Sequence, residues 1–363
     1  MQTLHGHFCF PNQKFSSPDQ GSSAFLLAAT GCQSAVTRGL EATAVQMCLD
    51  ARSYDKARKS LAQVTGHSLM TRQTLCNWVI KTAQRIDTRL TQEVEKALEC
   101  PLPPLASEVD LYDPHTKEVI VFEDGILVKA QKPTHEGQGE IKKDKPCQFH
   151  QSYFGLAPGP DGSYAFVMGT SEGTTPLSSV LRAFVCAHWQ DQHEALNLVA
   201  ITDGAKDLRR DLLTAFGVRV VTILDWFHLR KKVCEICSML VSTKQARTLL
   251  KKQMLKLLFH GQVSEALQVL WELPVRNALM QQKLVTYLQK HAEEIIDYWR
   301  RAQIKKPISS GRMEKGVDLV IGMRQKDNGM SWSKLGSYAL GMVTAYRATG
   351  NWDALWNTAE MAA

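Results

Sequence analysis

Two aspartates at the ends of neighbouring apolar runs are the residues of this sequence best suited to chemistry. Residues 197–202, NLVAIT, are apolar and rich in branched side chains, as a buried parallel strand is, and the run stops at Asp203. A helical pattern follows, and the next apolar run, residues 218–224, stops at Asp225. Parallel strands joined by a right-handed helical crossover end at one edge of a sheet. We therefore expect Asp203 and Asp225 to share that edge.

Clustered carboxylates offer hard oxygen ligands, which suit divalent metal ions. His228 adds to the pattern, because the second strand then delivers an Asp-x-x-His pair where the next helix starts. Simpler roles exist for each residue: an Asp before Gly often forms a turn or caps a helix, and a single His is often packed or solvated.

These motifs resemble the signature of DDE transposases with an RNase H-like core. The match is DG at one strand end and D-x-x-H at the next, and residues 224–229, LDWFHL, resemble the LD-x-FHL segment of the ISKra and ISLre groups of insertion-sequence transposases in the Mutator-type supergroup. The resemblance implies a DNA transposase that cleaves and transfers the ends of an insertion sequence. It also implies two Mg²⁺ (or Mn²⁺) ions on three carboxylates, with Asp203 as the second acid and Asp225 and His228 as supporting residues.

Asp124 is the candidate for the first acid. It lies in residues 118–131, a predicted strand, and the Gly-x-x-V that follows it resembles the first-acid segment of the family. Glu123, Asp110 and Asp113 compete for the role. Adjacent side chains on a strand point to opposite faces, so Glu123 and Asp124 cannot both serve.

Glu314 is the candidate for the third acid. The segment SSG-x-x-E, followed by basic residues and then by residues 329–333, GMSWS, resembles the third-acid region of the family. Without that resemblance, a surface glutamate in a basic amphipathic helix is the better interpretation. The DNA-binding residues expected in this region are Arg312, Lys315, Arg324, Lys326 and Trp332.

The rest of residues 108–232 supplies the elements that would position these acids. Two further strands are predicted at 148–155 and 164–169, and a helix follows Thr175-Pro176. The resulting order β-β-β-α-β-α-β is that of the RNase H-like fold, an α/β class with a mixed sheet. Residues 233–306 are predicted to be an all-helical insertion, and residues 307–363 to return to the core as C-terminal helices.

The N-terminal third is predicted to bind DNA. Residues 1–39 are rich in Gly, Ser, Gln and Pro and read as irregular, whereas 40–100 show two helices joined by a short Gly-containing turn, a helix-turn-helix-like pattern that the family resemblance also favours. The Pro-rich segment 101–107 is a predicted linker. Within the second helix, Arg72, Gln73 and Asn77 are the candidates for DNA contact, and Leu75, Trp78 and Val79 form the predicted packing face.

Charge and composition fit a nucleic-acid partner. The chain of 363 residues carries a formal net charge of +7, with 44% hydrophobic residues. Residues 206–256 hold twelve Lys or Arg against four acids, and Arg230, Lys231 and Lys232 stand directly after the Asp-x-x-His pair. The expected partners are double-stranded DNA, both element ends and target, and further copies of the chain on that DNA.

The location expected from the sequence is cytoplasmic and nucleoid-associated. There is no apolar run of 18 residues, so we expect no membrane association, and the start of the chain does not resemble a signal peptide. Nine scattered cysteines favour free thiols in a reducing compartment. Cys234 and Cys237 have metal-binding spacing, but without a second pair they read as helix thiols.

Two other functions fit the same residues. One is a structure-selective nuclease on the same fold that cleaves without joining. The other is a catalytically inactive, transposase-derived DNA-binding protein. Two departures from the family favour it: the sequence shows no cysteine-rich zinc-binding segment, and it stops soon after its final helix. Both are expected of a shortened or decayed copy of a transposase.

Overall fold

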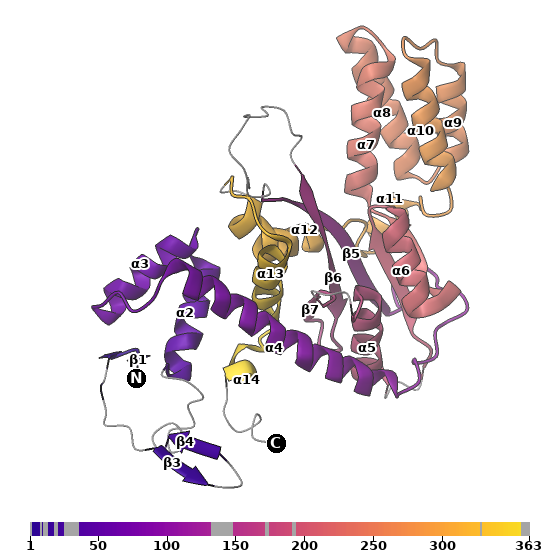
Figure 1. Cartoon of the computed structure of the whole chain (residues 1–363). Coiled ribbons are helices and arrows are strands. Elements are labelled where there is room, and N and C mark those ends of the chain that lie inside the picture. The colour runs from indigo at the N-terminus through magenta and orange to yellow at the C-terminus, as the bar shows by residue number, and fades with distance from the viewer. Residues whose placement is uncertain are drawn as a thin grey trace.

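A five-stranded mixed sheet forms the centre of the chain (Figure 1). The computed structural model describes residues 2–7, 9, 14–17, 21–24, 36–131, 148–170, 174–190, 194–326 and 329–356. The strands are β5 (Glu118–Lys129), β6 (Phe149–Pro158), β7 (Tyr164–Val167), β8 (Asn197–Thr202) and β9 (Val221–Leu224). Their order in the sheet is β7-β6-β5-β8-β9. The pairs β7–β6 and β6–β5 are antiparallel, and the pairs β5–β8 and β8–β9 are parallel.

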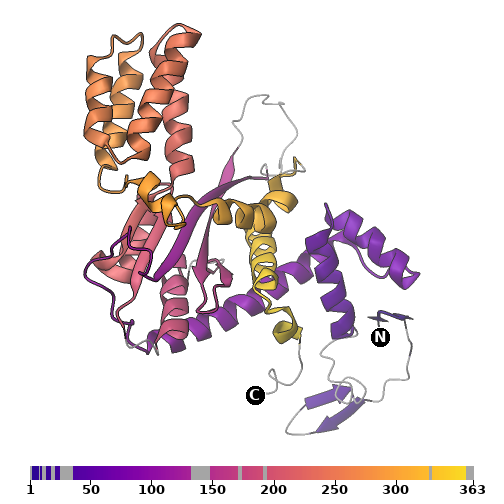
Figure 2. The same ribbon diagram turned by 180° about the vertical axis from the view of Figure 1, so that it is seen from behind.

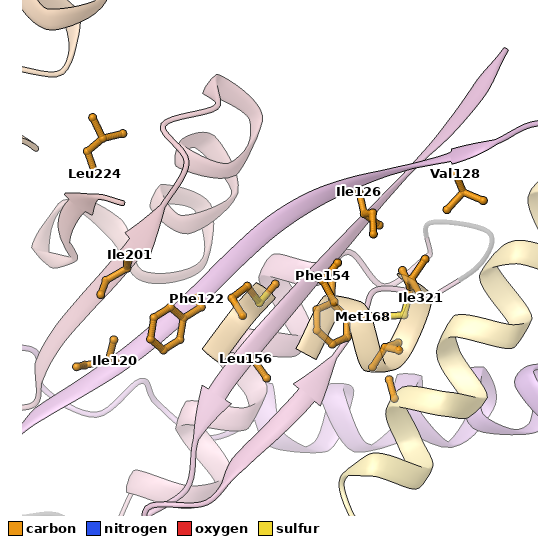
Figure 3. Packing of buried hydrophobic residues seen from close by; sticks show 14 of the residues in the cluster. Ile120, Phe122, Ile126, Val128, Phe154, Leu156, Met168, Ile201, Leu224 and Ile321 are labelled. Carbon is orange, nitrogen blue, oxygen red and sulfur yellow. The ribbon is translucent and has the colours of Figure 1, made fainter. Parts of the chain in front are cut away.

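Both faces of this sheet are buried, each in its own apolar cluster. Phe122, Ile126 and Phe154 pack in the cluster shown in Figure 3, together with Ile321 from the C-terminal helices. Val121 and Ala200, which alternate with the first set along their strands, pack in the second cluster on the opposite face. Asp124 has the parity of Phe122 and Ile126 and therefore belongs to the first face, whereas Glu123 belongs to the second.

The helices that cover the second face come from the crossover connections. These are α5 (Leu177–Trp189) and α6 (Lys206–Phe216), whose buried residues Leu181 and Leu212 join the second cluster. The first face is covered by α12 (Gly311–Val317) and by η2 (Asp318–Lys326), a π-helical turn, with α13 (Lys334–Ala348) behind them. The elements thus follow the predicted order, β-β-β-α-β-α-β, before the chain returns to the sheet.

A group of helices stands beyond the carboxyl ends of β8 and β9 (Figure 2). It consists of α7 (Trp226–Leu240), α8 (Lys244–Phe259), α9 (Val263–Glu272), α10 (Ala278–Lys290) and the short α11 (Tyr298–Gln303). These helices span residues 226–303, which overlap the helical insertion predicted at residues 233–306. The first helix of the group, α7, begins directly after Asp225, so the group is attached at the edge where the aspartates lie.

The N-terminal helices are α2 (Arg38–Asp50), α3 (Tyr54–Thr65) and the long α4 (Arg72–Leu98). The last helix of the described chain is the short α14 (Trp352–Trp356). Leu75 and Val79 are buried and Arg72 and Asn77 are exposed, as predicted for α4. However, α4 also packs along α13 and α5 (Figure 1), so this region shares its core with the rest of the chain.

Two sequence-based expectations about secondary structure differ from the structure. The described parts of residues 1–39 contain short strands, β1 (Gln2–Thr3) with β2 (Gly6–His7) and β3 (Lys14–Ser17) with β4 (Gly21–Ala24), rather than irregular chain alone. Strand β9 also starts later than expected. Gly217, at φ +72°, leads into a short 3₁₀ turn, η1 (Gly217–Arg219), which leaves Val218 91% exposed.

Candidate acidic site at the sheet edge

Three aspartates occupy equivalent positions on three neighbouring strands. Phe122 pairs with Ile201, and Ile201 pairs with Ile223. Two residues beyond each member of this row come Asp124, Asp203 and Asp225. The Asp225 backbone N–H donates to the Thr202 carbonyl oxygen at 2.8 Å, which extends the β8–β9 ladder to the aspartates. Neighbouring strands lie about 4.8 Å apart, so the three side chains are gathered at one edge.

The closeness of these carboxyl groups affects the pKa of Asp124. Asp124 is half-buried, and burial together with the charge of Asp203 raises the pKa of its carboxyl group to about 6. The charge of Asp225 acts in the same direction, and His228 opposes it. Asp203 is also half-buried, and its Oδ1 accepts a hydrogen bond from the Ala205 N–H at 2.8 Å, which fixes the turn after β8.

Asp225 is a fully buried structural residue at this edge. Its Oδ1 accepts from the Phe227 N–H at 2.6 Å and the His228 N–H at 3.2 Å, which caps α7, and its Oδ2 accepts from the Ser310 N–H at 2.7 Å and from the Ser310 hydroxyl. Burial alone would raise the pKa of Asp225, but hydrogen bonds from His228 and Ser310 hold it below its usual value. Asp225 therefore ties β9, α7 and the start of α12 together.

His228 lies beside this carboxylate. Its Nδ1 is 3.5 Å from Asp225 Oδ2, which is long for a hydrogen bond but close for an ion pair. The Asp225 carboxylate, with smaller contributions from Asp124 and Asp203, raises the pKa of the imidazole. His228 thus faces the acids, and their charges favour its protonated form.

Glu314 lies on α12, the helix that covers the face of the sheet carrying Asp124. The backbone N–H of Glu314 donates to the carbonyl oxygen of Ser310, the residue before the helix, at 2.9 Å. Gly316 lets α12 approach the sheet, since a Cβ there would lie 2.7 Å from Phe166 Cε1. Within the described ranges, however, no three His, Cys, Asp or Glu side chains are arranged so that they could hold one metal ion. A place for Glu314 beside Asp124 and Asp203 remains a prediction.

The acids that compete with Asp124 have other surroundings. Glu123 is 1% exposed on the opposite face, where neither carboxyl oxygen has a hydrogen-bond partner, and burial followed by the charge of Asp211 raises its pKa to about 8. Asp110 and Asp113 precede β5 and each accepts a backbone N–H two residues on, at 2.8 and 2.9 Å. They form turns before the start of the strand, away from the sheet edge with the other aspartates.

The end of α10 packs onto this edge, which the sequence patterns did not indicate. His291 is 2% exposed, and a Cβ on Gly204, at φ +81°, would lie 2.7 Å from its Cε1. His291 Nδ1 is 2.5 Å from Glu294 Oε2, and Glu294 Oε1 is 3.0 Å from Arg209 on α6. This buried network binds the insertion to the Asp203-Gly204 turn, and no local motif marks residues so far apart in the chain.

Most of the basic residues expected to bind DNA are exposed. They are Arg72, Arg230, Lys231, Lys232, Arg312, Lys315 and Lys326. Two other residues that the sequence predicts to bind DNA, Arg324 and Trp332, are buried and therefore cannot contact DNA. Arg324 is 4% exposed, lies 4.9 Å from the Trp332 ring and 5.2 Å from the Tyr54 ring, and donates to the Cys48 and Arg52 carbonyls. Trp332 is 7% exposed, and its Nε1 donates to the Gln325 carbonyl, so it belongs to the core.

The thiol pair Cys234 and Cys237 behaves as expected for helix cysteines. Cys234 is half-buried and Cys237 is buried on α7, and burial raises the pKa of Cys237 to about 12. Burial of Cys237 in the apolar core agrees with the interpretation of the pair as helix thiols.

The sequence matches no protein-family model and no curated protein. Among solved structures, the chain is similar to a Drosophila P element transposase strand transfer complex, at 10% sequence identity over 90% of this chain and 83% of that chain, with a TM-score of 0.28. At this TM-score the likeness supports no conclusion about function. No helix in the described part of the chain is long and apolar enough to cross a membrane.

Proposed function

We propose that the chain is a metal-dependent DNA transposase with an RNase H-like catalytic core. The observation that carries the proposal is the row of Asp124, Asp203 and Asp225 across β5, β8 and β9, in which burial and the charge of Asp203 raise the pKa of Asp124. The sheet order and the D-x-x-H segment resemble those of insertion-sequence transposases of the ISKra and ISLre groups. The chain would cleave the ends of such an element and transfer them to target DNA.

The chemistry of the donor set fits hard divalent cations. Asp124 and Asp203 offer clustered carboxylate oxygens at a partly solvated edge, and a bound cation would relieve the repulsion that raises the pKa of Asp124. Mg²⁺ or Mn²⁺, when bound there, would activate an oxygen nucleophile and stabilise the leaving oxygen. Glu314 on α12 would complete the ligand set.

The remaining residues of the edge would orient the acids. Asp225 holds the start of α7 and the start of α12 through Ser310, so it would fix Asp203 relative to Glu314. His228 would balance the negative charge of the acids before a metal binds. The exposed cations of α7, Arg230 to Lys232, and Arg312 and Lys315 on α12 would contact DNA phosphates.

A strand-transfer assay with pre-cleaved candidate ends tests this function. In Mg²⁺, wild-type protein should join the 3′ end to target DNA, and Glu314→Gln should reduce joining to background, because the amide keeps the volume of the side chain but cannot neutralise a cation. Cleavage without joining would favour the nuclease instead. Full joining by Glu314→Gln would remove Glu314 from the ligand set.

One observation favours a second candidate, a catalytically inactive DNA-binding protein. Over the described residues no three-ligand metal group is assembled, although the basic surface is present. This candidate predicts salt-sensitive DNA binding with no cleavage in Mg²⁺ or Mn²⁺.

A further inference from the structure

A groove of about 520 Å³ lies between α7 and α10. Each helix lines it with one stripe of residues at i, i+3, i+4 and i+7, the spacing of a single helical face. The stripes are Lys232, Glu235, Ile236 and Met239 on α7, and Lys283, Thr286, Tyr287 and Lys290 on α10. The groove is therefore built by two facing helical surfaces.

The charge of the groove is positive. Three lysines, Lys232, Lys283 and Lys290, line it against one acid, Glu235, and all four residues are exposed. Lys232 Nζ lies 5.6 Å from the centre of the Tyr287 ring, a cation–π distance, and within the described ranges none of the three lysines forms an ion pair. A concave surface with uncompensated cations favours a polyanion.

The inner end of this groove reaches the acidic edge. Lys290 Nζ lies 3.5 Å from the carbonyl oxygen of Gly204, the residue after Asp203. Tyr287 is close enough to the acids that, after burial, the charge of Asp203 contributes most to raising the pKa of its hydroxyl. A strand that follows the groove inward therefore arrives at Asp203.

The size of the groove selects among polyanions. A volume of about 520 Å³ is that of a small-ligand pocket, about 300–1,000 Å³, so the groove can enclose one or two nucleotides but not a DNA duplex. Met239 on one wall is 45% exposed and Leu279, also in the lining, is 65% exposed, so the groove offers apolar surface to a base or sugar beside its lysines.

We propose that the α7–α10 groove holds one or two unpaired nucleotides of a DNA strand, with their phosphates on Lys232, Lys283 and Lys290. The proposal extends the proposed function, since the strand in the groove would be the one presented to the acids. Binding alone can be measured without cleavage, so the two proposals can fail separately.

The test compares three DNA ligands that share one strand of the same length and sequence. One is a blunt duplex, and in the other two the complementary strand is four nucleotides shorter, which leaves a single-stranded 3′ tail or 5′ tail. Binding to full-length protein is measured by fluorescence anisotropy in EDTA over a series of salt concentrations. The variant is Lys283→Gln/Lys290→Gln, and the control is Lys252→Gln/Lys256→Gln, two exposed lysines of α8 outside the groove. Circular dichroism and thermal unfolding establish that each variant is folded.

Wild-type protein should prefer one tailed duplex to the blunt one, and the groove variant should lose that preference, with about tenfold weaker binding of the tailed ligand. Two lost single-strand phosphate contacts should also lower the salt slope by about 1.4. The α8 control should keep the tail preference. Equal weakening for blunt and tailed DNA would overturn the proposal in favour of a general duplex-binding face, and unchanged binding would overturn it altogether.

Failure of the proposed function gives a different pattern. If tail preference depends on Lys283 and Lys290 but the protein has no cleavage activity, nucleotide binding in the groove is supported and the transposase function is refuted. Cleavage by a protein whose tail preference ignores these lysines would support the transposase and remove the groove.

Discussion

Asp124 and Asp203 lie side by side because each stands two residues beyond the paired Phe122 and Ile201 on parallel strands. The same row continues to Asp225 through the pairing of Ile201 with Ile223. The paired strands therefore bring the acids together, and the turn after β8, fixed by the hydrogen bond from the Ala205 N–H, sets the position of Asp203. A site fixed in this way is held rigidly before any ligand binds.

This relationship predicts that the charge of Asp203 raises the pKa of Asp124 in the metal-free protein. Asp203→Asn should lower the pKa of Asp124 from about 6 but leave it above its usual value, because burial, the larger cause, remains. Side-chain carboxyl ¹³C chemical shifts measured against pH would show this. Asp207→Asn, an exposed aspartate on α6, is the control and should leave the Asp124 titration unchanged. An Asp124 pKa that ignores Asp203 would show that the two carboxyl groups are not neighbours.

The bond between Asp225 and Ser310 predicts a pH-dependent loss of stability. Ser310→Ala removes a hydrogen bond to a buried carboxylate, so it should lower the free energy of unfolding at pH 7 by about 1.5–3 kcal/mol. The folded pKa of Asp225 lies below its unfolded value near 3.8, so this stabilisation is present above that value and is lost as the pH falls through the folded pKa. Urea unfolding at pH 7 and at low pH measures the difference. Ser309→Ala is the neighbouring control, and an equal effect from it would refute the assignment.

Glu123 predicts the opposite dependence on pH. Its folded pKa of about 8 exceeds its unfolded value of 4.5, so stability is greatest below pH 4.5 and falls as the pH rises towards 8, at about 1.4 kcal/mol per pH unit for this one group. Glu123→Gln should remove that fall, because the amide does not ionise. Thermal unfolding in EDTA between pH 5 and pH 9 compares the two proteins. Parallel curves would mean that Glu123 has a partner in solution.

Gly204 predicts how closely the insertion depends on the turn that carries Asp203. Gly204→Ala forces a Cβ into His291 at a backbone φ of +81°, so it should destabilise the protein by more than about 1 kcal/mol. His291→Ala in the same chain should recover the part due to the clash with His291, leaving the clash with Leu224 Cδ1, 2.8 Å from that Cβ, and the backbone strain. Gly217→Ala is the control for strain alone, because a Cβ there meets no atom within 4 Å. Additive costs in the Gly204→Ala/His291→Ala protein would exclude the contact.

Local patterns in the sequence predicted the strands and their aspartates. The run NLVAIT forms β8 at the predicted residues, and Asp124 lies within β5, because apolar alternation and turn residues act over a few positions. The position of His291 against Gly204 could not be predicted in this way, since it depends on how a distant helix docks. The prediction that Arg324 binds DNA was wrong for a related reason. A cation in an amphipathic pattern normally faces water, but two aromatic rings and two backbone carbonyls enclose Arg324.

The central claim is that the acids at this edge hold a metal ion for phosphodiester cleavage, and Asp203 tests it most directly. Nicking of supercoiled plasmid DNA in Mn²⁺ needs no knowledge of the element ends, and it can be measured for wild type, Asp203→Asn and the Asp207→Asn control. We predict that wild type and the control nick the plasmid, that Asp203→Asn falls to background, and that all three bind DNA in EDTA within about threefold of each other, since phosphate contacts from Lys and Arg do not involve Asp203. Equal nicking by Asp203→Asn and wild type would contradict the claim.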